Sequence, residues 1–591
     1  MSIGVRVRAL RACWIAGLAI TVAGCAMLRP APEAAAPQAD TADSGTARTY
    51  LSLAELREDK SDWAGAQGVV EKGLAQRPGN QALSLRRAQI LLHRATSEDE
   101  PAMREDARAT LAPFADSTDA EARMSLAWLA VADGQRDDAI AAAHAAADTD
   151  PASPRMQRIL AYLLLRNGDF QRANDAAGRA VKLDPSSRTA LRLRARTRLA
   201  TADVGGAAAD AREVLRAHRD DPESAAILAD AELRQGDDEA ALRVLENVPR
   251  DRRNARVLVP LARLELAAGH AATGRALLEE AAQHHPNDPQ VHEALVALDI
   301  REGRADESSQ RLEAAVAARP DSASLQRLRA QALGAARRDD EAAAGFARAV
   351  QLDPNDAATY RALTEWLRTR TRSDETERRA AELGLAAGPT LVAIGQLRDS
   401  RGDRSGARSH YQKALEADPT LGVARAALAA SLVESGEQLD LALTLAREAR
   451  AQRPLDPEIA ATLGRVHLRR GQAEAALELL SQAAGTYPVY QPGYAEVLFH
   501  TAMAFDAKRD RESARRTVEV ALAVLGDRKP EPGWAAPARG LLARSRPAPA
   551  APKLEPVAST PAPAVPEMTA AATPPDPAAT AAPAEPATPA P

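Results

Sequence analysis

Histidines are the residues of this chain whose type and spacing come nearest to metal chemistry. His292-Glu293 begins like a zinc-protease motif, but Val296 occupies the position one helical turn on where the second histidine ligand must stand. His284 and His285 are adjacent, and adjacent side chains on a helix point in different directions. A solvated helix end is therefore a better interpretation of that pair than a metal site, and the sequence predicts no metal and no cofactor.

Paired carboxylates could act as a general acid and base, and three such pairs occur at one repeated position (Asp137-Asp138, Asp237-Asp238 and Asp339-Asp340). Recurrence at a turn before a helix indicates capping of free N–H groups. The chain contains no phosphate-binding loop, no nucleophile elbow, no CxxC pair and no dinucleotide glycine fingerprint. The sequence therefore predicts a protein that is not an enzyme.

Cys25 is the residue for which the sequence predicts a covalent modification. A basic start (Arg6, Arg8 and Arg11) precedes an apolar run over 12–23, which is shorter than a membrane-spanning helix needs. The run ends in Val22-Ala23-Gly24-Cys25, which resembles the bacterial lipobox. That resemblance implies a lipoprotein signal peptide over 1–24, then a lipidated (palmitate-bearing) cysteine and a flexible tether over 25–46. The alternative is an ordinary cleaved signal peptide with an incidental cysteine.

The residue after this cysteine bears on location. Ala26 stands where an aspartate would suggest retention at the inner membrane of many Gram-negative lipoproteins, so the resemblance implies the periplasmic face of the outer membrane. The chain has two cysteines, and Cys13 would leave with the signal peptide. A mature chain without a free thiol suits an oxidising compartment.

The composition limits the fold and the partners. Hydrophobic residues make up 45% of the 591 residues but aromatic residues only 3%, which favours closely packed helices over large β-sandwiches. The net charge of -5 arises from 76 basic and 81 acidic residues, so the chain has no strong basic field for nucleic acid.

A helical hairpin is the unit that repeats along the chain. Thr390–Pro419 reads as two amphipathic helices joined at Gly402-Asp403, in which the small residues Gly395, Ala407 and Ala414 allow the backbones to approach and Tyr411 fills the space beside them. Three kinds of marker recur at intervals of about 34 residues: turn glycines (Gly134, Gly168, Gly236, Gly269, Gly303, Gly402, Gly436 and Gly471), small residues (Ala139, Ala173, Ala207, Ala241, Gly274, Ser308, Ala342, Ala407, Ala442, Ala476 and Ala514) and closing prolines (Pro151, Pro185, Pro286, Pro320, Pro354, Pro419, Pro454 and Pro488).

This pattern resembles the tetratricopeptide repeat (TPR). The resemblance implies an all-α fold, a TPR α-solenoid, with roughly fourteen repeats over 47–526. The unit 359–389 departs most because it lacks the turn glycine, which predicts altered stacking there. We expect a capping helix over 527–546, in which Trp534 and Leu541 cover the last repeat.

A Pro/Ala-rich tail follows over 547–591. Its composition predicts a disordered or polyproline-like segment. An inert spacer is the simpler interpretation, and a segment that threads or contacts the cell wall is the alternative.

The candidate binding site is a groove lined by the first helix of each hairpin, as the TPR resemblance implies. Carrying the groove positions over to the fourth and fifth units gives Arg155, Arg158, Tyr162, Arg166, Arg192 and Arg196. Guanidinium groups bind carboxylates in a bidentate fork, so this set suits a carboxylate-bearing peptide or an anionic polysaccharide. The alternative is that these arginines only solvate the surface.

The leading hypothesis is a lipid-anchored periplasmic scaffold that binds protein partners, such as components of envelope assembly or exopolysaccharide export. The last two repeats are similar in style to TPR lipoproteins of exopolysaccharide and exosortase-associated systems. The alternative is a pilotin-like assembly factor for a type IV pilus or secretion system, although such proteins are usually shorter. RNA binding by helical repeats is disfavoured by the export signal and the charge.

Overall fold

The computed structural model describes residues 44–58, 62–98, 101–286, 288–370, 375–526 and 531–545, and these form one compact unit that ends at Ser545. The predictions for the signal peptide, for Cys25 and for the tail lie outside the described residues, as does most of the tether.

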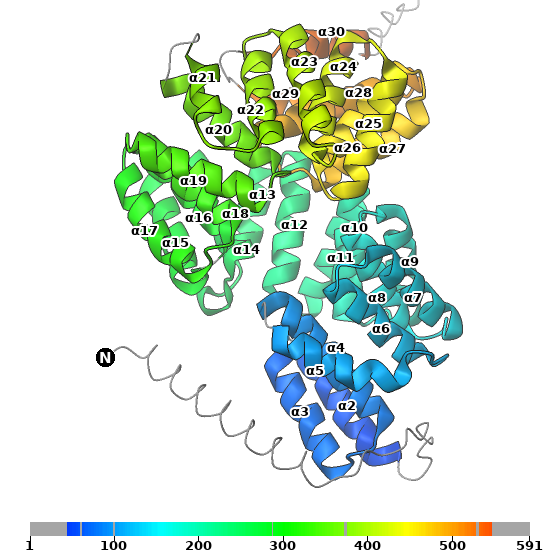
Figure 1. Cartoon of the computed structure of the whole chain (residues 1–591). Coiled ribbons are helices and arrows are strands. Elements are labelled where there is room, and N and C mark those ends of the chain that lie inside the picture. Colours follow the sequence, from blue (N-terminus) through cyan, green and yellow to red (C-terminus); the bar gives the residue numbers. More distant parts are fainter. Residues whose placement is uncertain are drawn as a thin grey trace, which may run out of the picture. The chain divides into compact units, whose positions relative to one another are not determined.

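Within the residues described there are 29 α-helices and no strand, so the predicted all-α class is confirmed (Figure 1). The first half contains α2 (Ser44–Glu58), α3 (Trp63–Gln76), α4 (Gln81–Glu98), α5 (Pro101–Leu111), α6 (Ala120–Ala132), α7 (Arg136–Thr149), α8 (Pro154–Arg166), α9 (Phe170–Leu183), α10 (Arg188–Ala200), α11 (Val204–Ala217), α12 (Pro222–Gln235), α13 (Asp238–Glu246), α14 (Ala255–Ala267) and α15 (Ala271–His284). The second half contains α16 (Pro289–Arg301), α17 (Ala305–Ala318), α18 (Ala323–Ala335), α19 (Asp339–Leu352), α20 (Ala357–Arg370), α21 (Thr376–Ala381), α22 (Ala387–Ser400), α23 (Arg404–Ala417), α24 (Gly422–Ser435), α25 (Leu439–Gln452), α26 (Pro457–Arg469), α27 (Ala473–Thr486), α28 (Pro492–Ala507), α29 (Arg511–Leu525) and α30 (Ala535–Ser545).

The helices from α2 to α29 pack as fourteen consecutive antiparallel pairs, each an even-numbered first helix followed by an odd-numbered second helix. Each first helix also contacts the first helix of the next pair. The first helices therefore form a continuous row, which is the arrangement of a helical solenoid.

Left-handed backbone at the hairpin turns explains the recurring glycines. All eight predicted turn glycines have φ between +72° and +88°, a region that side chains bearing a Cβ enter only at a cost. Where the glycine is missing, other residues take the same conformation at the equivalent position: Ala202 (φ 61°), Arg337 (φ 65°) and Arg509 (φ 65°). The repeat geometry therefore imposes this turn whatever the residue.

The predicted small residues lie in the contact between the two helices of each hairpin, and all of them are buried. In the pair α22–α23, a Cβ added at Gly395 would lie 2.4 Å from the Tyr411 ring, which is itself 1% exposed. Close approach of backbones therefore requires these small side chains.

The hydrophobic core is divided into clusters that each span neighbouring repeats. One cluster gathers Phe346, Tyr360 and Trp366, and another gathers Tyr487, Tyr494 and Phe499. Stability is consequently shared along the stack and does not depend on one central core.

The unit that was predicted to be irregular is the one with the shortest second helix. The first helix, α20, is followed by α21, which has only six residues. At the C-terminal end, α30 packs with Leu541 2% exposed, and Trp534 stacks on Phe499 with ring centroids 5.7 Å apart.

Candidate functional site

A cavity of about 250 Å³ lies along the first helices of the N-terminal repeats. Its lining comes mainly from α4, α6, α8 and α10, and comprises Glu58, Trp63, Gln89, Ile90, His93, Trp128, Arg155, Arg158, Ile159, Tyr162, Thr189, Arg192, Leu193, Arg196 and Glu223. We call this lining the N-terminal groove. Five of the six predicted groove residues belong to it, and the successive first helices α8 and α10 bring these five together.

A row of aromatic rings runs along the N-terminal groove. Trp63 stacks on His93 with ring centroids 3.6 Å apart, His93 meets the edge of Trp128 at 6.1 Å, and Trp128 lies 5.3 Å from Tyr162. Such ring pairs each contribute about 0.5–1.5 kcal/mol beyond the area they bury. The row therefore provides a rigid apolar wall.

The sequence contains a signal for this row that our prediction missed. His93, Trp128, Tyr162 and Arg196 follow one another at about the repeat period, so they occupy one position of successive first helices. The prediction found only Tyr162 and Arg196, because it used only the fourth and fifth units.

The arginines of the groove are paired with carboxylates. Five pairs lie in or beside the lining: Arg86–Glu58 at 3.0 Å, Arg155–Glu121 at 2.5 Å, Arg158–Glu55 at 3.9 Å, Arg192–Asp221 at 3.5 Å and Arg196–Glu223 at 2.9 Å. The sequence prediction treated the arginines as a basic stretch. Since each has an acidic partner from another repeat, the charge of the groove is mixed.

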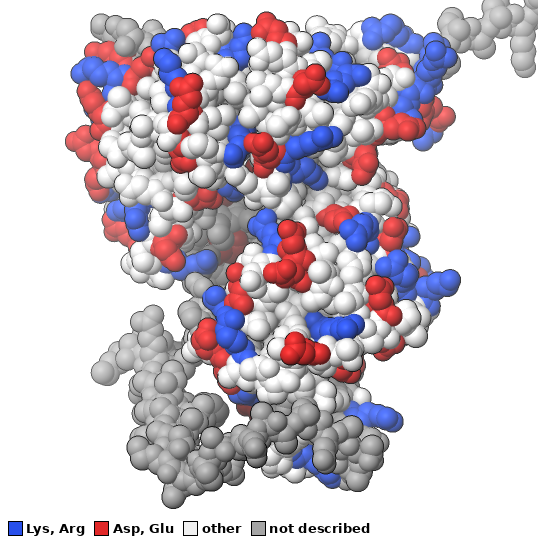
Figure 2. Space-filling model, turned by 45° about the vertical axis from the view of Figure 1, so that its right-hand side comes forward, with Lys and Arg blue, Asp and Glu red and all other residues white. Residues whose placement is uncertain are grey.

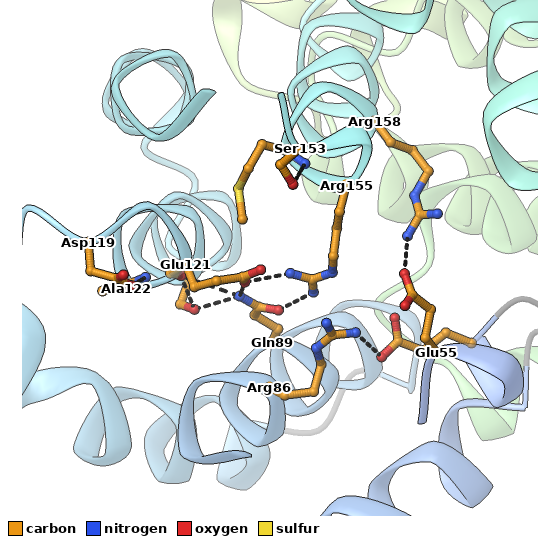
Figure 3. Close-up of polar contacts among 12 residues, drawn as sticks. Glu55, Arg86, Gln89, Asp119, Glu121, Ala122, Ser153, Arg155 and Arg158 are labelled. Carbon is orange, nitrogen blue, oxygen red and sulfur yellow. Dashed lines mark hydrogen bonds and ion pairs between the residues drawn. The ribbon is translucent and has the colours of Figure 1, made fainter. Parts of the chain in front are cut away.

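The best-connected of these pairs is shown in Figure 3. Arg155 donates to both Glu121 and the side-chain oxygen of Gln89, and the Gln89 amide donates in turn to Glu121 at 3.1 Å and to Ser125 at 2.7 Å. Arg158 reaches back to Glu55 on α2 in the same view. Side chains from three hairpins, on α4, α6 and α8, thus form one hydrogen-bonded network, and the Arg158–Glu55 ion pair separately links α8 to α2.

The pKa shifts in this network follow from burial and charge. Burial works against the charge of Arg155, but Glu121 and Glu58 outweigh it and raise its pKa. Burial likewise opposes ionisation of Glu121, yet Arg155 and Arg86 hold its pKa below the usual value. Both groups are therefore charged at neutral pH.

His93 is a neutral imidazole in the groove. Burial lowers its pKa to about 4, and nearby Arg166 adds to the effect against the opposing charge of Glu58. Its Nδ1 is buried and has no hydrogen-bond partner. This nitrogen is a polar atom of the cavity wall that the protein's own groups leave unsatisfied.

Arg166 is the one predicted groove residue outside the lining. Its guanidinium lies 6.0 Å from the centroid of the Tyr162 ring, and its Nη1 donates to the Tyr162 hydroxyl at 3.3 Å. It therefore supports Tyr162 from the side.

The histidines considered for metal binding have structural surroundings. His292 is 3% exposed and its Nε2 lies 2.7 Å from the Pro286 carbonyl oxygen, while His284 lies at the exposed end of α15. Among the residues described, no group of three or more His, Cys, Asp or Glu side chains is placed to hold a metal ion.

The predicted acidic caps are correct for one pair in three. Asp237 caps α13 by accepting from the Ala240 N–H at 2.8 Å. The pairs at 137–138 and 339–340 lie one to three residues beyond the cap, within the first turns of α7 and α19, where they face the positive end of the helix dipole.

The remaining surface carries both signs of charge. Figure 2 shows acidic and basic side chains interspersed over the face that it displays. None of the helices in the described part of the chain is both long and apolar enough to cross a membrane.

Comparison with known families agrees with this architecture. Two family models, both described as tetratricopeptide repeat, match the chain, one at residues 265–332 and the other at residues 124–188, 160–221 and 427–490. These matches and the paired helices define a helical-repeat protein. In particular, the matched residues are tetratricopeptide repeats, the repeat family that the sequence predicted.

Several solved structures are similar at low identity. The APC/C hetero-tetramer Cut9-Hcn1 is 14% identical, with 85% of this chain and 97% of that chain covered and a TM-score of 0.36. Yeast Tom70 is 15% identical, with 66% and 96% covered and a TM-score of 0.29. A tetratricopeptide repeat protein from Parabacteroides merdae is 18% identical, with 42% and 98% covered and a TM-score of 0.33. All three TM-scores are low, and the repeat assignment rests on the family models. No curated protein sequence matches the chain.

Proteins of this family typically act as non-enzymatic scaffolds for protein interactions. In this chain the N-terminal groove is the concave site that combines an aromatic wall, an unsatisfied buried nitrogen and a paired-charge network.

Proposed function

We propose that this protein is an envelope scaffold that holds a segment of a partner protein in the N-terminal groove. The observation that carries the proposal is the aromatic row from Trp63 to Tyr162, which lines a cavity of about 250 Å³. Rigid aromatic side chains in a concave site are the usual anchors of protein recognition.

The charge pairing bears on the kind of ligand. Because each groove arginine already has a carboxylate within 4 Å, an anionic ligand must displace that partner before it binds bidentately. A protein segment that places an apolar side chain beside Trp128, Ile159 and Leu193 needs no such exchange. We therefore favour an apolar peptide anchor over an acidic peptide or an anionic polysaccharide.

The same proposal includes the place of the protein in the cell. The sequence Val22-Ala23-Gly24-Cys25 supports a lipid anchor on Cys25, and Ala26 supports the periplasmic face of the outer membrane. In that place a scaffold would gather components of envelope assembly, and export of an exopolysaccharide is the specific role we propose.

Co-purification from membranes tests the binding proposal. Trp128→Ala removes the centre of the aromatic row and should weaken capture of the partner by about 30-fold, the loss expected of an interface hot spot. Arg172→Ala, on the exposed side of α9, is the matched control and should bind normally. Equal capture by both variants would refute the proposal that the partner binds in the N-terminal groove.

The identity and salt dependence of the captured partner separate the alternatives. Recovery of export or glycan-synthesis proteins supports the scaffold role, whereas recovery of pilus subunits supports the pilotin-like alternative. Capture of a polysaccharide that is lost at high salt would favour the anionic ligand, since salt screens exposed charges.

A further inference from the structure

Two distant parts of the repeat array contact each other directly. The C-terminal end of α27 and the start of α28 lie against α10, α12 and α14, which precede them by more than two hundred residues in the sequence. We call this the closure contact and define it by Arg234, Arg263, Gly485, Tyr487 and Tyr490.

Arg234 is the polar centre of the closure contact. It is 9% exposed, and its guanidinium donates to the backbone carbonyls of Ala484 and Tyr487, the latter at 3.2 Å. These carbonyls lie at the C-terminus of α27, where the helix leaves its last acceptors unpaired and its dipole is negative.

The side chains around Arg234 keep it charged. Asp230 accepts from its Nε at 3.1 Å, and the Tyr494 ring centroid lies 5.6 Å from its guanidinium carbon. Burial opposes the charge, but Asp230 and Tyr494 outweigh it and raise the pKa of Arg234. A buried cation from one repeat thus caps a helix seven hairpins further along the chain.

Two further contacts join the same distant repeats. A Cβ added to Gly485 would lie 2.1 Å from the Leu199 carbonyl oxygen, so the backbones of α27 and α10 touch at a glycine. Arg263 on α14 stacks over the Tyr490 ring with its guanidinium carbon 3.4 Å from the centroid. The contact combines a cap, a close backbone approach and a cation–π pair.

We propose that the closure contact is an intramolecular latch that joins the ends of one turn of the solenoid. It goes beyond the proposed groove function, since it uses none of the groove residues, although α10 belongs to both the groove and the contact. Between the joined ends lies an inner cavity of about 660 Å³, lined by α16, α18 and α20 on one side and by α26 and α28 on the other. An ion pair between Arg361 and Glu458 spans this cavity from α20 to α26.

The latch determines whether this inner cavity exists. While it is closed, Glu293, Arg327 and Arg361 face Glu458 and Arg465 across the interior. When it opens, the two sides separate and the first helices of the middle repeats become accessible to a partner.

Hydrogen exchange of the full-length protein tests the latch. Arg234→Ala should speed backbone exchange at least about tenfold at the end of α27, at the start of α28 and at the end of α10, because those amides lose a protecting neighbour. Arg243→Ala, on the exposed face of α13, is the matched control and should leave exchange unchanged.

A second variant tests the latch without removing the charge of Arg234. Gly485→Leu places a side chain where the α10 backbone lies, yet leucine is a better helix former than glycine. Faster exchange at α10 and α28 in this variant can therefore arise only from separation of the two ends. Wild-type exchange at these sites in both variants would overturn the proposal.

Discussion

The carboxylate of Glu121 lies 2.5 Å from the guanidinium of Arg155, although the two residues occupy the same position of successive first helices. Arg86 precedes them at that position and Glu223 follows two repeats later, so the sign of the charge varies along the row. A carboxylate between two cations is attracted by both, as the lowered pKa of Glu121 reflects. The Glu121–Arg155 pair therefore links the third hairpin to the fourth.

The first prediction concerns this pair. Glu121→Gln should leave Arg155, whose side chain is 11% exposed, without its ionic partner. Because the Glu121 side chain is 37% exposed and partly screened, we expect a loss of about 1–2 kcal/mol, below that of a fully buried pair. Hydrogen exchange of α6 and α8 measures it locally. Glu239→Gln, whose carboxylate is 89% exposed, should have no measurable effect.

The second prediction concerns the turn residues with positive φ. Ala202→Gly should stabilise the protein by about 1 kcal/mol, because glycine adopts the left-handed conformation without the clash of a Cβ. Gly134→Ala should destabilise the protein by a similar amount. Nothing lies within 4 Å of the added Cβ, so the whole loss comes from holding alanine in the left-handed backbone conformation. Thermal unfolding midpoints measure both. Shifts of the same sign in the two variants would contradict the account.

The third prediction concerns pH. The pKa of His93 is about 4 in the folded protein against 6.5 ordinarily, so between these values the unfolded chain binds a proton that the folded chain does not. Stability should therefore fall as the pH drops from 6.5 to 4, by up to about 3 kcal/mol from this residue.

A variant without the imidazole separates this effect from acid effects elsewhere. His93→Gln should lose less stability than the wild type between pH 7 and pH 4.5. His284→Gln, at the exposed end of α15, should behave like the wild type. Identical pH profiles for all three proteins would show that His93 titrates normally in the folded state.

The fourth prediction concerns the lipid anchor. Cys25→Ser should abolish labelling of the protein with palmitate in cells, because no other cysteine of the mature chain is available for acylation. Cys13→Ser should leave labelling intact, since that residue precedes the predicted cleavage site. Undiminished labelling of the Cys25 variant would remove the anchor from the proposal.

Repetition made the fold predictable from the sequence. Gly402 and Ala407 are each weak signals alone, but the same residue types one repeat away turn them into evidence for a hairpin. The structure confirms the left-handed turn at Gly402 and the burial of Ala407. The positions without the expected residue, such as Ala202, follow the backbone of their neighbours because packing on both sides fixes it.

The sequence predicted the location of the groove arginines but not their pairing with carboxylates. Arg155 and Arg192 lie where the repeat pattern puts them, yet the pattern says nothing of Glu121 and Asp221, which belong to other repeats and pair with them only after stacking. The closure contact was beyond prediction for the same reason. Arg234 and Tyr487 meet only because the curvature of many repeats accumulates, and no local signal encodes that sum.

Photo-crosslinking in cells from Tyr162 tests the central claim most directly, because this ring lies in the wall of the N-terminal groove. A photoreactive phenylalanine derivative at position 162 should capture a discrete partner protein, and Trp128→Ala in the same chain should reduce the yield at least about tenfold. The same probe at exposed position 172 on α9 should capture none of it. Capture of the partner from position 172 but not from position 162 would contradict the account.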